Sequence, residues 1–132
     1  MLGDMSTFTP LEQTAVAAIL VENAEHRAII EQQLMQTVVL SRENTGGGFF
    51  TELEVGSDAQ SFEADRPSLG QNVWLGVEGL EFGLGMILHF ENGRASLLEG
   101  YAVAPEDTCA IDFADVRFAV VSESGPLSTN GS

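Results

Sequence analysis

The sequence predicts a single α+β domain, in which an N-terminal helical pair packs on a mainly antiparallel sheet of five to six strands. Apolar residues recur at helical spacing between about residues 9 and 36, whereas short β-branched or alternating segments follow from Thr37 onward. The chain has 132 residues, of which 44% are apolar, and this suits one domain with one hydrophobic core. We expect a loose leader over residues 1–8, the domain over residues 9–121 and a disordered tail over residues 122–132.

The first helix has strong start signals. Thr9 can act as the N-cap, Pro10 fits the first helical position, and Glu12 completes a capping box three residues after Thr9. The helical spacing of apolar residues is interrupted at residues 22–25. A second helical stretch then runs to about Gln36, so we expect either a helical hairpin or one kinked helix.

Six later segments have the composition or the alternation of β-strands. They cover residues 37–43, 49–55, 72–77, 82–90, 94–103 and 113–121, and the last is also compatible with an apolar edge. The mostly polar residues 56–70 predict a long loop, with Phe62 as an anchor. Asn92-Gly93 is the strongest hairpin signal, because a type I′ turn requires positive φ at both central positions.

A two-residue turn at Asn92-Gly93 sets the register of the hairpin around it. If the alternation continues without interruption, apolar side chains gather on one face, which we expect to be buried: Leu84, Met86, Leu88, Phe90, Ala95, Leu97 and Tyr101. Glu99 lies on that face too, and a buried carboxylate needs a partner or a proton. The opposite face is expected to be solvated and carries His89, Glu91, Arg94 and Ser96.

Arg42 shares a face with Val38 and Leu40 if the first strand alternates regularly. When that face points inward, Arg42 is the natural partner for Glu99, since a guanidinium meets a carboxylate through two hydrogen bonds. We expect a buried or half-buried pair whose role is to fix the fold. The alternative is a polar site at the floor of a pocket. In either case the candidate residues are Arg42, Glu43, Glu99 and Tyr101.

The net charge of −15 reflects a shortage of bases more than an excess of acids. There are 20 acids against five bases, and the bases are all arginines. Nucleic-acid binding needs clustered Lys and Arg, and an anionic membrane would repel the chain, so both partners are excluded. A basic protein partner suits the charge, because opposite charges speed encounter. Solubility alone, or a host living at high salt, is the simpler explanation of the acidity.

The sequence shows no membrane-spanning segment, no signal peptide and no second cysteine, and these three absences predict a cytoplasmic protein. Apolar runs fall far short of the roughly 20 residues that span a bilayer, and no signal-peptide pattern is present. The single Cys109 cannot form an internal disulfide.

No motif supports an enzyme, and we expect no catalytic residue, no cofactor and no metal. His89 and Glu91 could touch one ion, but two ligands do not make a site. Cys109 has no histidine nearby in sequence to activate it. The Gly46-Gly47-Gly48 run lacks the lysine of a phosphate-binding loop and instead predicts a flexible hairpin tip.

Two segments carry a resemblance to a known family. The first, within residues 41–51, reads Arg-Glu-x-Thr-Gly-x-Gly-Phe-Phe-Thr, and the second, within residues 91–101, ends in Leu-Glu-Gly-Tyr after an Asn-Gly turn. Over about residues 11–101 the chain resembles a family of small bacterial proteins without an assigned function. Members often carry a Trp-Pro pair after the tyrosine, where residues 102–105 here read Ala-Val-Ala-Pro. Some such acidic proteins lie near toxin genes, so the resemblance implies an immunity or antitoxin-like role.

We therefore expect a non-catalytic protein-interaction module that binds a basic protein, with a homodimer as a further form. The alternative is a small-ligand binder or enzyme with a polar pocket near Arg42, Glu43 and Glu99. A concave polar pocket at those residues would favour the alternative, whereas a flat acidic face with exposed Trp74 or Phe50 would favour the interaction module.

Overall fold

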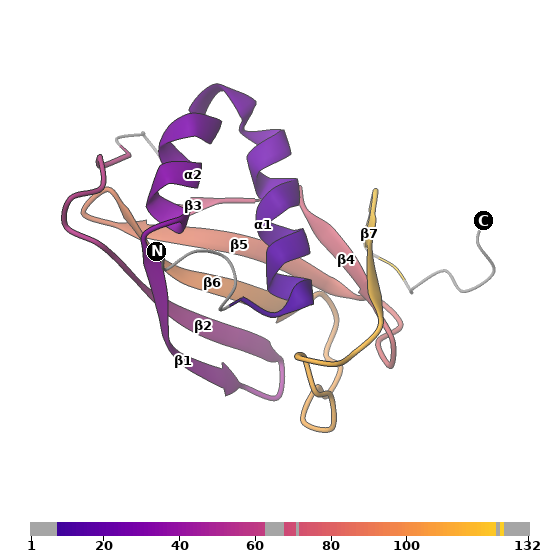
Figure 1. Ribbon diagram of the computed structural model, residues 1–132. Coiled ribbons are helices and arrows are strands. Elements are labelled where there is room, and N and C mark those ends of the chain that lie inside the picture. Colours follow the sequence, from indigo (N-terminus) through magenta and orange to yellow (C-terminus); the bar gives the residue numbers. More distant parts are fainter. Residues whose placement is uncertain (1–7, 63–67, 71, 124, 126–132) are drawn as a thin grey trace.

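The fold comes from a computed structural model, which describes residues 8–62, 68–70, 72–123 and 125. Two α-helices pack on one face of a seven-stranded antiparallel sheet (Figure 1). The predicted α+β class, with its helical pair at the N-terminus, is confirmed. Most of the predicted leader and tail lies outside the described residues, but Phe8, placed at the end of the leader, is 4% exposed and belongs to the core.

The helical pair forms a hairpin, which is one of the two predicted arrangements. Helix α1 (Pro10–Glu22) begins with the capping box, in which Thr9 and Glu12 each bind the backbone amide of the other at 3.1 and 2.9 Å. A short 3₁₀ helix, η2 (Ala24–His26), follows the end of α1 and leads into α2 (Arg27–Leu34). Both helices lie against the same face of the sheet (Figure 1). None of the helices in the described part of the chain is long and apolar enough to cross a membrane.

The strands follow the predicted order, with one addition. They are β1 (Thr37–Asn44), β2 (Gly48–Val55), β3 (Ser68–Leu69), β4 (Trp74–Val77), β5 (Leu84–Glu91), β6 (Arg94–Ala102) and β7 (Phe118–Val121). Their spatial order is β1-β2-β6-β5-β4-β7, and β3, which lies in the predicted loop, pairs with β5. Phe62 anchors that loop as predicted, because it is 4% exposed and its ring centroid lies 4.9 Å from that of Phe90. Asn92 and Gly93 both have positive φ, as the predicted turn requires.

A β-bulge at Ser96 changes which residues of β6 face the core. His89 pairs with Leu97 and not with Ser96, so the register shifts by one residue. Beyond the bulge Leu98 is fully buried, because an extra residue reverses the alternation of side chains. The predicted inward face is confirmed for the apolar residues of β5. It is wrong for three residues after the bulge, which turn to the opposite face: Leu97, Glu99 and Tyr101.

A second irregularity lies in β1, between Val39 and Ser41. Leu40 is the extra residue here, and it is 57% exposed, as Val38 is at 44%. Val39 packs against the core, and the shift brings Arg42 onto the face of Val39. Arg42 therefore points towards the helices as predicted, although Val38 and Leu40, its predicted companions on that face, do not.

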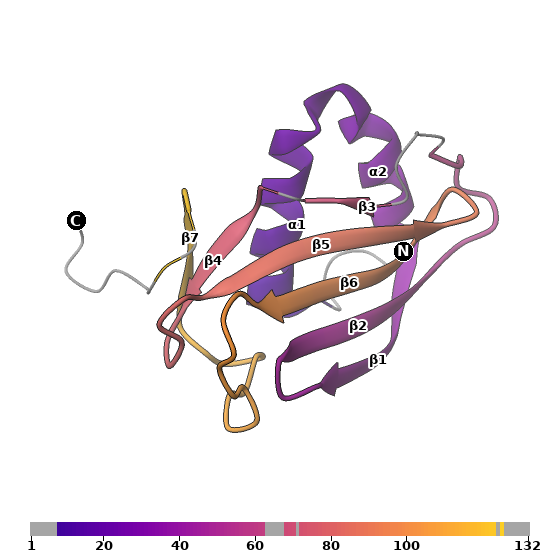
Figure 2. The same cartoon turned by 180° about the vertical axis from the view of Figure 1, so that it is seen from behind.

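The sheet thus has two unlike faces. The helices cover one of them, and the side chains between the two layers form the core. The other face, called the open face below, is the one that Figure 2 shows in front, with both helices behind the strands.

Candidate functional site

The first candidate site is a buried carboxylate between α1 and the β1–β2 hairpin. Glu12 is 1% exposed. Arg42 donates from Nε to Oε2 and from Nη2 to Oε1 of Glu12, both at 2.9 Å, in the two-pronged arrangement that suits a guanidinium. The Thr51 hydroxyl donates to Oε2 at 2.6 Å, and the Thr9 amide donates to Oε1 at 2.9 Å. Each carboxylate oxygen of Glu12 therefore accepts two hydrogen bonds.

These contacts keep Glu12 ionised despite its burial. Burial raises the pKa of the Glu12 carboxyl, but the hydrogen bonds from Arg42, Thr51 and Thr9 outweigh it and bring the pKa below its usual range. The hydrogen bond to Glu12 also raises the pKa of Arg42, against the opposing effect of burial. A general acid or base needs a pKa near the working pH and a free position for the proton. Glu12 has neither, so its geometry is that of a structural ion pair.

Arg42 and Glu99, which the sequence predicts to pair, lie on opposite faces of the sheet. Glu99 follows the buried Leu98 along β6 and points away from the helices. Its Oε1 lies 2.9 Å from Nε2 of His89. The predicted Arg42–Glu99 pair is therefore wrong, because the bulge at Ser96 moves Glu99 to the open face.

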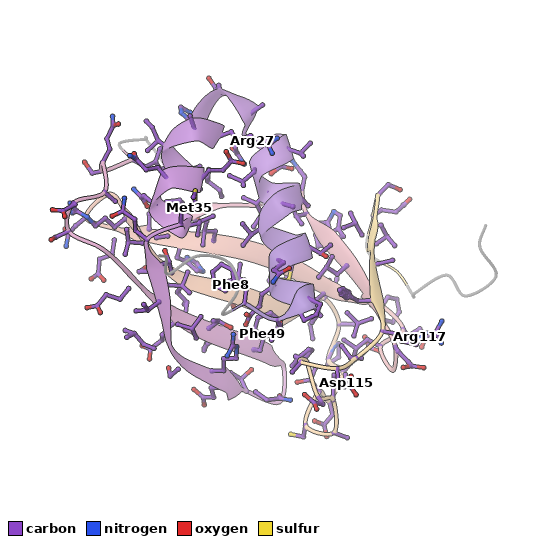
Figure 3. All side chains as sticks on the ribbon, in the orientation of Figure 1. Phe8, Arg27, Met35, Phe49, Asp115 and Arg117 are labelled. Carbon is purple, nitrogen blue, oxygen red and sulfur yellow. The ribbon has the colours of Figure 1, made fainter. Side chains whose placement is uncertain are left out.

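A cavity of about 210 Å³ lies beside the Glu12–Arg42 pair. Phe49 and Phe113 form one wall, with ring centroids 4.9 Å apart, and Figure 3 shows Phe49 near the end of α1 closest to β2. Arg42 and Glu43 also line the cavity, whereas Glu99 and Tyr101 are not among its lining residues. Pockets for drug-sized ligands measure roughly 300–1,000 Å³, so this one would suit only a small molecule.

The loop that completes this cavity is tied to the tip of the β1–β2 hairpin. The Asn44 side chain donates to the carbonyls of Thr108 at 2.8 Å and Ile111 at 3.1 Å. Thr108 is fully buried, and its hydroxyl donates to Asn44 Oδ1 at 2.9 Å and accepts from the Gly48 amide at 3.0 Å. These bonds hold the cavity wall and the glycine-rich tip together.

The second candidate site lies on the open face. The pairing of β1, β2, β6 and β5 brings four residues into one row: Glu43, Phe50, Glu99 and Ile87. Glu99 and its partner His89 are half-buried, with side chains 26% and 34% exposed. Three of the predicted site residues, Glu43, Glu99 and Tyr101, thus share the open face, and Arg42 lies on the other.

Tyr101 and Trp74 form an aromatic pair in the next row of the open face. Their ring centroids are 6.5 Å apart and their planes meet at 73°. Gly85 lies between them in the sheet, and a Cβ on Gly85 would overlap the phenol end of Tyr101, so the Tyr101 ring rests over the glycine. Burial, and secondarily the charge of Glu99, raises the pKa of Tyr101. The phenol is therefore neutral at physiological pH.

Sequence reasoning missed the role of Glu12 in the first site and the contact between Trp74 and Tyr101 in the second. Glu12 was assigned to the capping box alone, yet it lies four and seven residues before Val16 and Ile19, both fully buried. A carboxylate on the buried stripe of a helix is a signal that it needs a cation inside the protein. The sequence predicts Trp74 as a mark of an interaction face, but nothing in it indicates the contact with Tyr101, because the two residues come from strands that are distant in sequence.

In the described part of the chain, no three His, Cys, Asp or Glu side chains are placed to hold a metal ion together. Comparisons with protein-family models, with curated proteins and with solved structures give no match. The resemblance of the two segments to a bacterial family therefore stays a prediction.

Proposed function

We propose that the protein is a non-catalytic interaction module that binds a basic protein through the open face of its sheet. The observation that supports this most is the mixture of side chains on that face. Its apolar members include Phe50, Trp74, Ile87, Leu97 and Tyr101, and its acids include Glu43, Glu52, Glu54 and Glu99. Aromatic side chains supply the apolar centre of an interface, and surrounding carboxylates attract and orient a cationic partner.

Exposure supports the same proposal. Phe50 is 37% exposed although β2 is not an edge strand, and Trp74 and Tyr101 are each half-buried. An apolar group of this kind on an accessible sheet surface, rimmed by charge, is typical of a protein-binding site.

The arginines of the described residues are engaged elsewhere and do not neutralise these acids. Arg27, Arg42, Arg94 and Arg117 each have a partner within the chain. In the same order, the partners are Glu31, Glu12, the backbone carbonyls of Ser57 and Ala59, and Glu78. None of these partners is Glu43, Glu52, Glu54 or Glu99, and the net charge of the chain is −15.

The biological role that we propose for this binding is that of an immunity or antitoxin-like protein. It draws support from the resemblance of the two segments in residues 41–51 and 91–101 to small bacterial proteins of that setting. The first segment supplies Glu43 and Phe50 to the open face and the second supplies Glu99 and Tyr101, so both segments contribute to the proposed surface.

Charge-matched variants test the proposal. Glu43→Gln/Glu52→Gln removes two charges from the open face, and Glu22→Gln/Glu25→Gln removes two from exposed positions of the helical layer. A partner captured from host lysate at low salt is identified, purified and titrated against each form by calorimetry. We expect about tenfold weaker binding for the open-face variant and less than about twofold for the control. Equal losses, or no partner at low or high salt, would overturn the proposal.

The absence of lysine allows the contact surface to be mapped directly. A carbodiimide joins carboxylates to amines, and this chain has no side-chain amine of its own. Its cross-links to a lysine-bearing partner therefore report which of its acids lie in the interface. We expect cross-linked peptides that contain Glu43, Glu52 or Glu99, and none at Glu22 or Glu25.

The cavity beside Arg42 and Glu43 favours a second candidate function, which is the binding of a small ligand. Its wall of Phe49 and Phe113 suits a small aromatic molecule. Titration with indole, followed by amide NMR, should shift resonances around Phe113 and leave those of Trp74 unchanged. Phe113→Trp would fill the cavity and abolish the shifts. Failure of indole to shift the wild-type resonances around Phe113 counts against this function.

A further inference from the structure

The ring of Tyr101 has two different surroundings. One side rests over Gly85, where the missing side chain lets the phenol lie close to the backbone of β5. Tyr101 remains half-buried, so part of the ring stays accessible on the open face. Trp74 stands beside it at a steep angle of 73° between the ring planes. The two rings thus form a corner, with Tyr101 as its base.

A carboxylate lies next to this corner. Glu99 precedes Tyr101 by two residues on β6 and projects from the same face, with 26% of its side chain exposed. Its charge contributes, after burial, to the raised pKa of Tyr101, which places the carboxylate within electrostatic reach of the phenol. His89 contacts one oxygen of Glu99, Oε1.

We propose that Tyr101, Trp74 and Glu99 form a receptor for one arginine side chain of the partner protein. This inference rests on the proposed function and names the chemistry of its anchor. A guanidinium is planar, stacks on aromatic rings and forms directed hydrogen bonds with a carboxylate. A guanidinium stacked on Tyr101 would direct its N–H groups towards Glu99, and the ring of Trp74 would close one side of the site.

Lysine fits this corner less well. Its ammonium is a strongly hydrated point charge, so it loses more hydration on entering a half-buried site and cannot stack. The general attraction of the acidic face acts on both side chains alike. The corner formed by the two rings should therefore determine the preference for arginine over lysine. The acidic face as a whole determines the attraction of either side chain.

Trp74 and Tyr101 are the one tryptophan and the one tyrosine of the chain, so intrinsic fluorescence reports directly on this site. The probes are a nine-residue arginine peptide and a nine-residue lysine peptide, titrated at low salt. We expect the arginine peptide to change the Trp74 emission at a concentration about fivefold lower or more, since only arginine engages the rings.

Gly85→Ala is the decisive variant. Its Cβ would displace the free end of the Tyr101 ring, and Gly85 has no positive φ, so the change moves the ring while every charge stays in place. We expect the arginine preference to vanish and the response to the lysine peptide to persist. Gly47→Ala is the matched control, because a Cβ there meets nothing within 4 Å.

Changes at Tyr101 itself keep the test independent of how Gly85→Ala folds. Tyr101→Phe retains the ring and should keep the arginine preference, whereas Tyr101→Leu should lose it. If both peptides act equally on the wild type, or if Tyr101→Leu keeps the preference, the arginine receptor is refuted while the acidic interaction face still stands. If neither peptide binds by fluorescence or calorimetry, the proposed face itself fails.

Discussion

Arg42 and Glu12, 30 residues apart in sequence, meet through two parallel hydrogen bonds of 2.9 Å that join the first strand to the first helix. The carboxylate is also the N3 residue of its own helix, so one side chain caps α1 and attaches it to the sheet. An ion pair with one buried member adds little net stability compared with apolar packing. Removing one partner, however, leaves the other without its counter-charge.

Glu12→Gln should therefore lower the stability in a pH-dependent way. The folded pKa of Glu12 is lowered, so its contribution is fully present above the unfolded pKa of about 4.3 and is lost as the pH falls through the folded value. We expect the variant to be less stable by about 3 kcal/mol at pH 7, with the gap closing below about pH 4. Urea unfolding at a series of pH values measures it, with the exposed Glu25→Gln as control. A gap that does not change with pH would contradict the ionised pair.

The bulge at Ser96 makes opposite predictions for two adjacent leucines. Leu98 is fully buried, so Leu98→Ala should cost about 2–5 kcal/mol of unfolding free energy. Leu97 is half-buried on the open face, and Leu97→Ala should cost less than about 1 kcal/mol. Chemical denaturation of both variants decides the register, because a regular hairpin would reverse the order of the two losses.

Gln33 is a buried side chain whose loss should separate α2 from the β5–β6 hairpin. It is fully buried, donates to the carbonyls of Gln60 at 2.8 Å and Gly93 at 2.7 Å, and accepts from the Ala95 amide at 3.0 Å. Gln33→Ala leaves these backbone groups without that partner, so we expect a loss of about 3 kcal/mol. Hydrogen exchange at the Ala95 amide should also accelerate. The neighbouring exposed Gln32→Ala should change neither quantity.

The triple-glycine tip contains one position that tolerates a side chain and one that does not. Gly48 has φ of +134°, and a Cβ there would overlap the carbonyl of Gly100 on the neighbouring strand. Gly48→Ala should disrupt the β2–β6 pairing at this end and cost more than about 2 kcal/mol. Gly47→Ala should change the melting temperature little, since nothing lies within 4 Å of the added Cβ. Equal tolerance of both changes would show that the tip can rearrange.

Local signals account for most of the elements. The capping box at Thr9 and Glu12 starts the first helix where it was expected, and the turn at Asn92-Gly93 has the predicted backbone. Both depend on residues a few positions apart, and such short-range interactions are readable from the chain. The short strand β3 could not be predicted in this way, because two residues show no periodicity and the strand forms only by pairing with β5.

The candidate site was predictable only in part. An arginine–carboxylate pair was expected from the alternation of the strands and from the need of a buried carboxylate for a partner, and Arg42 does point inward. Its partner is Glu12 and not Glu99, because bulges at Leu40 and Ser96 each reverse the direction of the residues that follow. A bulge depends on how two strands fit each other, and no residue near Ser96 in the sequence indicates it.

By itself, the sequence determined the class of the fold, the order of its elements and a strongly negative charge, because composition, periodicity and caps are local properties. Tertiary structure alone decided which acid meets Arg42, and it placed Glu99, Tyr101 and Trp74 together on the open face. The physical reason is that side-chain direction along a strand has a period of two. One extra residue exchanges the buried and exposed faces, and only the packing of the whole sheet selects where that residue goes.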